Sequence, residues 1–151
     1  MKFFLSTFAG VFLTAGAATA LALAASTPTA FTPDNLHWVA GTGPSKGSSA
    51  AVLSGNPDKA GFAVIRVNMP NGYTNQPHYH AHPEYITVIK GSLLFGTGNT
   101  INKSGAKTLP AGSFIVVPAG VHHWSIARGN TIEQVAGQGP QTNIPIKKGG
   151  M

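Results

Sequence analysis

Residues 78–84 read His-Tyr-His-Ala-His-Pro-Glu, and residues 121–124 read Val-His-His-Trp. These two short segments hold five of the six histidines and one of the four acidic residues in a chain of 151 residues. Histidine and carboxylate side chains gathered in this way are typical of a metal site. The sequence therefore predicts that three histidines and one glutamate bind a metal ion.

The geometry of an extended chain supports this interpretation. Successive side chains of a strand point to opposite faces, so His78, His80, His82 and Glu84 share one face if the segment is a strand. Imidazole nitrogens with a carboxylate oxygen suit Fe, Mn, Ni, Cu or Zn as divalent ions, and the absence of cysteine excludes thiolate sites. The alternative is that the histidines are unrelated surface or core residues, and a bare His-x-His pair does not decide between the two.

The first segment is part of a longer pattern. Gly72, His78, His80, Glu84 and Gly91 fill every fixed position of G-x5-H-x-H-x3-E-x6-G. This pattern resembles the first motif of the cupin superfamily.

The second segment completes the resemblance. Gly112, Pro118, Gly120 and His123 match G-x5-P-x-G-x2-H-x3-N, the second cupin motif, up to its final asparagine, where this chain has Ala127. That asparagine is not a metal ligand in the family, so the departure bears on close functional analogy more than on metal binding. Two gapped motifs in the right order are far more specific than either alone.

The resemblance implies a fold, a ligand set and a range of activities. The fold is all-β, a double-stranded β-helix or jelly roll. The ligands of the divalent transition metal are His78, His80, Glu84 and His123. The family includes dioxygenases, decarboxylases, isomerases and non-catalytic binders, and it suggests a homodimer. Fold alone does not choose among these activities.

His82 and His122 have no place in the motifs. In an extended segment His82 lies between His80 and Glu84, so it is either a further ligand or turned aside by a bulge. We favour a position beside the metal or facing the substrate, with Glu84 or His82 as the catalytic group that transfers a proton. The alternative is a rim histidine in contact with water. His122 is expected to point away from the ion that His123 binds.

The rest of the sequence also indicates an all-β domain. Its 19 glycines and 11 prolines favour short strands with tight turns, which is typical of a sandwich or closed barrel. We expect turns around Gly91 and Gly129, among others, and no helix of normal length after residue 25. The predicted strands are 62–69, 85–90, 92–95, 107–109, 113–117, 122–127 and 131–136.

The chain divides into four predicted parts. Residues 1–24 have a positive start, a long apolar stretch and small-x-small cleavage patterns, which predicts a secretory signal peptide and a secreted or periplasmic protein. An uncleaved leader is the alternative and the one expected membrane contact. Residues 25–60 form an arm that adds one or two strands to its own barrel or a partner's, residues 61–140 form the cupin domain, and residues 141–151 form a C-terminal tail.

Charge and residue content narrow the possible functions. The formal net charge of +6 falls to +5 without Lys2 and is dispersed, with no dense basic stripe interleaved with aromatics, so nucleic-acid binding is not expected. Serine residues lie in no nucleophile-elbow pattern, which argues against a hydrolase. We expect a metal-dependent oxidoreductase, dioxygenase-like, that acts on a small oxygen-rich substrate. A non-catalytic metal or small-ligand binding cupin of the cell envelope is the alternative.

Overall fold

The computed structural model describes residues 27–146, so the predicted leader and residues 147–151 lie outside the described residues. Short 3-10 helices occur at Pro33–Asn35 and Gly43–Ser45. Within residues 27–146 no helix has the length and apolar character needed to cross a bilayer. The strands are β1 (Val39–Ala40), β2 (Ser49–Ser54), β3 (Gly61–Met69), β4 (Thr74–Tyr79), β5 (Glu84–Thr97), β6 (Lys107–Pro110), β7 (Phe114–Val117), β8 (His123–Gly139) and β9 (Ile144–Pro145).

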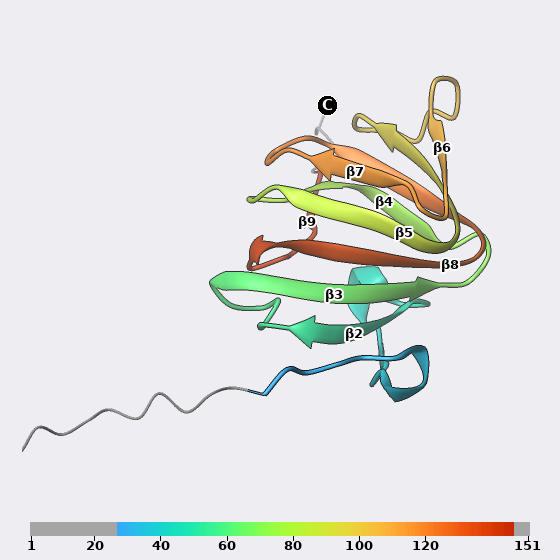
Figure 1. Cartoon of the computed structure of the whole chain (residues 1–151). Helices are drawn as coiled ribbons and strands as arrows, with labels where there is room; N and C mark the ends of the chain where they lie inside the picture. The colour runs from blue at the N-terminus through green and yellow to red at the C-terminus, as the bar shows by residue number, and fades with distance from the viewer. Residues whose placement is uncertain (1–26, 147–151) are drawn as a thin grey trace, which may run out of the picture. The chain divides into compact units, whose positions relative to one another are not determined.

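These nine strands form one curled antiparallel sheet, and the predicted all-β jelly roll is confirmed. Figure 1 shows β2, β3, β8, β5 and β7 side by side. The two halves of β8 have different neighbours, since β4 pairs with its first half and β3 with its second. β5 lies along the other edge of both halves, and β6 and β7 pair with β5 in turn. The long strands β5 and β8 therefore carry the jelly roll.

The predicted turns around Gly91 and Gly129 are wrong, because each glycine lies inside a long strand. The predicted strands 85–90 and 92–95 are one strand, β5, and 122–127 and 131–136 lie in β8. The register of β5 against β8 shifts between Val88 and Ser92, where Gly91 has φ +70°. A Cβ at Gly91 would lie 2.6 Å from Thr131 Oγ1, so the glycine permits a bulge beside the partner strand. The sequence signals therefore mark bends within strands.

The arm and the tail both contribute to the sheet. β2 lies in the segment predicted as an arm and pairs with β3 of the same chain. β9 lies in the segment predicted as a tail and pairs with the end of β4. Both ends of the described domain therefore border the barrel.

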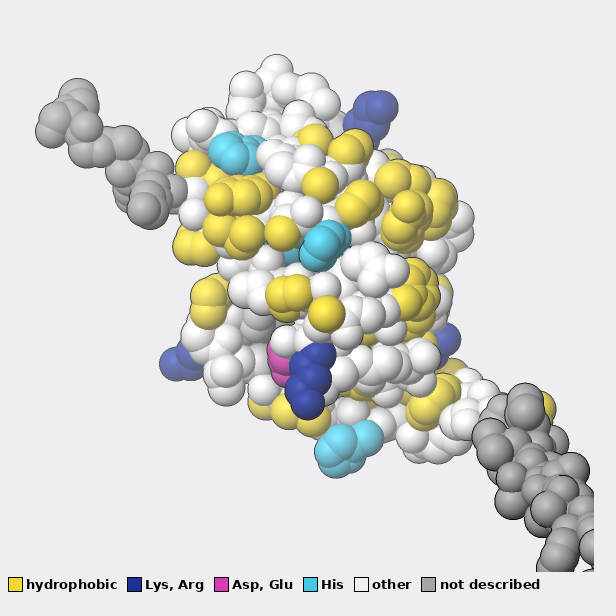
Figure 2. Space-filling model, turned by 90° about the vertical axis from the view of Figure 1, so that its left-hand side faces the viewer, with side chains coloured by type: hydrophobic (Ala, Val, Ile, Leu, Met, Phe, Trp, Pro, Cys, Tyr) yellow, Lys and Arg dark blue, Asp and Glu magenta, His cyan; other side chains and the backbone are white. Residues whose placement is uncertain are grey.

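The core consists of two apolar clusters between the inner faces of the sheet. One is centred on Met69, Val88 and Leu93, and the other on Phe95 and Val135. From Glu84 to Ile89 the buried positions of β5 alternate with more exposed ones, as expected for a sheet with one buried face, whereas residues 93–96 are all buried. Several large apolar side chains remain exposed, and Figure 2 shows groups of apolar side chains on one face, with Lys and Arg side chains lying apart from one another.

Candidate metal centre

The candidate site lies where β4 ends and where β5 and β8 begin. His78 is near the end of β4 and pairs directly with His123, the first residue of β8. His80 follows β4 by one residue, and Glu84 is the first residue of β5. Three elements that are separated in sequence therefore bring four predicted ligands to one end of the barrel interior.

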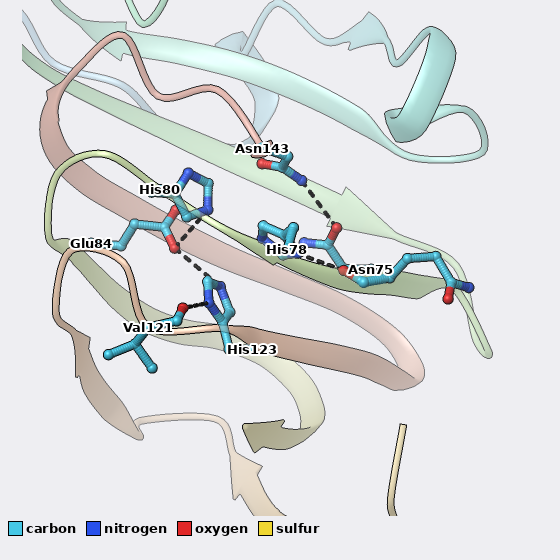
Figure 3. Close-up of polar contacts among 8 residues, drawn as sticks. Asn75, His78, His80, Glu84, Val121, His123 and Asn143 are labelled. Carbon is cyan, nitrogen blue, oxygen red and sulfur yellow. Dashed lines mark hydrogen bonds and ion pairs between the residues drawn. The ribbon is translucent and has the colours of Figure 1, made fainter. Parts of the chain in front are cut away.

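The side chains of these residues converge. Donor nitrogens of His78, His80 and His123 all lie within 4.8 Å of one another. Two ligands of one ion are at most about 4.2 Å apart at bond lengths of ~2.1 Å, so small adjustments are enough for all three to reach a common ion. Glu84 Oε2 lies 3.1 Å from His80 Nε2 and 3.4 Å from His123 Nε2 (Figure 3). All four residues are buried, with exposed fractions of 4% for His78, 5% for His80, 8% for Glu84 and 3% for His123.

Hydrogen bonds to the backbone orient two of the imidazoles. His78 Nδ1 donates to the carbonyl oxygen of Gln76 at 2.6 Å, and His123 Nδ1 donates to that of Val121 at 2.9 Å. Each bond places the proton on Nδ1 and leaves the Nε2 lone pair free, as metal-ligating histidines require. The Phe95 ring stacks on the His123 ring.

The donor set fits a divalent transition metal. Both ring nitrogens of His80 are buried without a hydrogen-bond partner, although Nε2 lies close to Glu84. A buried polar atom without a partner is costly, and a metal ion at the centre of the cluster would supply one. Three imidazoles and one carboxylate suit borderline ions such as Fe, Mn, Ni, Cu and Zn.

The charge states of the cluster suit cation binding. Burial, together with the neighbouring imidazoles, lowers the pKa of His78 to about 4, so His78 is neutral at pH 7. Burial alone would raise the pKa of Glu84, but its contacts with His123 and His80 outweigh burial and lower that pKa to about 2. Neutral imidazole and ionised carboxylate are the forms that bind metals.

The structure separates His82 and His122 from this group. His82 is half-buried in the connection 80–83 and does not line the cavity. The chain leaves the extended conformation after β4, so the condition under which His82 would share a face with His80 and Glu84 is not met, and His82 is turned aside, the other alternative left open. His122 points elsewhere, as expected: it contacts the Tyr79 ring and Asn99 Oδ1.

The four clustered residues line a cavity of about 160 Å³. An engineered cavity of roughly 150 Å³ holds benzene, so the space suits a small organic molecule. Its walls include Ile65, Ile86 and Val135. Sequence analysis missed the polar residues that complete the lining: Asn75, Ser125, Glu133, Gln141 and Asn143.

Two of the missed residues, Gln141 and Asn143, come from the predicted tail. Gln141 Nε2 donates to the carbonyl oxygens of Ala63 and Gly137, and Asn143 Nδ2 donates to Asn75 Oδ1 (Figure 3). No motif spacing marks them, since their position depends on β9 returning to the edge of β4.

A comparison with protein families identifies the fold family. The family model for Cupin matches residues 42–144, which is more than half of the chain. The chain belongs to the cupin family. The match begins within the predicted arm and ends within the predicted tail.

Curated relatives of this cupin are germin-like proteins of plants. Germin-like protein 5-1 of Oryza sativa subsp. japonica is 30% identical over 112 residues, which are 68% of this chain and 51% of the relative. The cupin therefore spans about half the length of that relative.

Solved structures with the same fold belong to proteins of diverse kinds. The polyketide cyclase RemF from Streptomyces resistomycificus has a TM-score of 0.64 at 16% identity, covering 82% of this cupin and 88% of that chain. An acetylacetone dioxygenase from Acinetobacter johnsonii has a TM-score of 0.60 at 19% identity, covering 76% and 75%. At these identities the likeness extends to the fold alone.

Proposed function

We propose that this cupin binds one divalent transition-metal ion through His78, His80, Glu84 and His123 and is a dioxygenase-like oxidoreductase of a small oxygen-rich substrate. One observation carries the proposal: three buried imidazoles and a carboxylate converge in a cavity with room for a small molecule. A purely structural ion is more often enclosed by protein ligands alone. The acetylacetone dioxygenase of the same fold is consistent with this class of activity.

The residues around the proposed metal ion would have different roles in the reaction. When bound, the ion supplies a Lewis acid and open coordination positions for dioxygen or substrate oxygens. The carbonyl groups of Gln76 and Val121 fix the imidazole rings, and apolar walls limit access of water. Of the two predicted proton-transfer groups, Glu84 lines the cavity and His82 does not. The low pKa of Glu84 makes it a weak proton acceptor, so its carboxylate serves first as a ligand.

The alternative function is non-catalytic binding of a metal or small ligand in the cell envelope. The observation that favours it is the scarcity of proton-transfer groups apart from the proposed ligands: the other ionisable residues that line the cavity are Tyr73 and Glu133. An enzyme that moves protons usually places acids or bases beside its substrate.

Metal analysis followed by oxygen uptake separates these functions. The metal content of protein from its native compartment is measured first, and oxygen consumption is then tested with catechols, flavonols and β-diketones. The cavity volume favours the smaller compounds, catechols and β-diketones. Oxygen uptake that disappears in His80→Ala supports the enzyme, and full metal loading without turnover of any of these classes supports the binding protein.

We also propose that the protein is exported and homodimeric. The apolar leader of residues 1–24 supports export, and N-terminal sequencing of the mature protein would show cleavage after Ala20 or Ala24. Exposed apolar side chains of Val39, Val52 and Phe62, on and beside the arm, offer a surface for a second copy.

A further inference from the structure

Glu133 is a buried acid in the middle of the sheet. It lies on β8 and pairs with Val67 of β3 on one side and Val88 of β5 on the other. Its exposed fraction is 6%, and it lines the same cavity as the three histidines and Glu84. The adjacent inward positions of β8 are apolar or hydroxyl-bearing, so the local sequence pattern does not predict an acid at this position.

The carboxyl group of Glu133 has no protein partner within residues 27–146. No hydrogen bond or ion pair reaches it from the described side chains or backbone. The nearest arginine in register, Arg66, donates from Nε to Gln134 Oε1, on the opposite face of the strand from Glu133. Burying an acid without a partner is costly, so its placement in the cavity wall needs a reason other than packing.

Burial and the ionisable groups that line the cavity set the protonation state of Glu133. β2 and β3 contribute no ionisable lining residue, and the others come from the turn before β4, from β4, from the connection that follows it, from β5 and from β8: Tyr73, His78, His80, Glu84 and His123. Burial, together with the negative charge of Glu84, raises the pKa of Glu133 to about 8. At pH 7 the group is mainly a neutral acid, which can donate a hydrogen bond.

Building on the proposed metal centre, we propose that Glu133 binds the substrate by donating a hydrogen bond from its carboxyl to one oxygen of a small molecule whose other oxygen faces the three histidines. The substrate class is then a compact compound with two oxygen functions, such as a dicarbonyl, a keto acid or a dicarboxylate. A compound about the size of benzene fits the cavity. Glu133 is thus a binding residue in the wall of the cavity that the proposed metal ligands also line.

The test measures ligand affinity without turnover. The protein is loaded with Zn²⁺, which is redox-inert, and titrated calorimetrically with acetylacetone, pyruvate and oxalate. The variants are Glu133→Leu and Glu133→Gln. Asp58→Asn, which changes an exposed carboxyl in the connection after β2, serves as the matched control. We expect equal zinc uptake in all four proteins, a loss of tenfold or more in probe affinity for Glu133→Leu, and a smaller loss for Glu133→Gln.

Two further readouts separate binding from a structural role. Wild-type affinity should fall as the pH rises through the titration of Glu133, whereas Glu133→Gln should show no such fall. An infrared band of a protonated buried carboxyl should be present in the wild type, absent from Glu133→Gln, and shifted by the bound probe.

The outcomes distinguish the two proposals. Normal zinc uptake with unchanged probe affinity in Glu133→Leu, or with no binding of any probe by the wild type, would overturn the role of Glu133. Failure of the wild-type protein to take up zinc would instead contradict the proposed metal centre on which this role rests.

Discussion

His78 and His123 are held by the same local device. Each ring donates from Nδ1 to the carbonyl oxygen two residues earlier in the chain. The orientation of these two imidazoles is therefore built into their own segments, while His80 has no backbone hydrogen bond: its Nδ1 has no partner and its Nε2 lies 3.1 Å from Glu84 Oε2. Of the three imidazoles, His80 would be stabilised most by a bound ion.

A matched pair of substitutions tests this difference between neighbouring histidines. We expect His80→Ala to lower metal affinity by at least about 100-fold, because it removes one of four ligands. We expect His82→Ala to leave metal affinity unchanged, because His82 does not line the cavity. Competition titration against a chromophoric chelator measures both. Comparable losses in the two variants would place His82 among the ligands and contradict the assignment.

Glu133 makes the stability of the metal-free protein depend on pH. Its pKa is about 8 in the folded protein against an ordinary value of 4.5, so the unfolded chain releases this proton first as the pH rises. The corresponding stability is present below pH 4.5 and is lost as the pH rises to 8. Glu133→Gln should therefore gain about 2–4 kcal/mol relative to the wild type between pH 5 and pH 8.

Urea unfolding of the metal-free proteins at the two pH values measures this gain. Asp58→Asn removes an exposed carboxyl and should follow the wild type. If the wild type and Glu133→Gln differ by the same amount at both pH values, the carboxyl of Glu133 is not held in a neutral form.

At the scale of single residues, the sequence predicted the four clustered residues better than the rest of the cavity lining. The fixed spacing of the two motifs identified the four clustered residues, because ligand geometry constrains local spacing. Glu133 escaped notice because an isolated acid in a strand is usually solvent-facing, and nothing local marks β8 as buried on that side. For His82 the sequence left two alternatives open, because it does not show where the strand ends, and β4 ends at Tyr79.

At the scale of elements, strands with a local sequence signal were predictable and strands without one were not. β3, β6 and β7 follow β-branched, regularly punctuated segments, so their predicted ranges nearly match. β4 is polar and contains Pro77, and β9 has two residues, so neither carries a local strand signal. Their pairing depends on neighbours that are distant in sequence.

The segment before β9 offers a test of its role. Gln141→Ala should lower the free energy of unfolding by about 1–3 kcal/mol, because it removes hydrogen bonds to Ala63 and Gly137. Gln138→Ala is the matched control, since Gln138 is exposed, and it should change stability by less than about 0.5 kcal/mol. Urea denaturation measures both. Equal effects would mean that Gln141 does not tie the end of the chain to the barrel.

At the scale of the whole molecule, the proposed dimer makes a separate prediction. Multi-angle light scattering on a chain that starts at residue 25 should give the mass of two copies. Substituting lysine for both Val52 and Phe62 should give one copy with an unchanged circular dichroism spectrum, because both side chains are exposed within one chain. A monomeric parent chain, or a dimer that survives the double substitution, would contradict pairing through this surface.

The jelly roll as a whole was predictable because its motifs fix both the strands and the site between them. The lining of the cavity was less predictable from the sequence, because the arm and the tail reach the cavity through the pairing of β2 with β3 and of β9 with β4. The proposed four-ligand centre is the common element on which the proposed activity and the role of Glu133 rest.

Anomalous diffraction from crystals of the purified protein, collected at the absorption edge of the metal found by elemental analysis, tests that centre most directly. We predict a single peak about 2.0–2.2 Å from Nε2 of His78, His80 and His123 and from a carboxylate oxygen of Glu84. A peak at His82 or His122, or fully metal-treated protein with no peak among the four residues, would contradict the account.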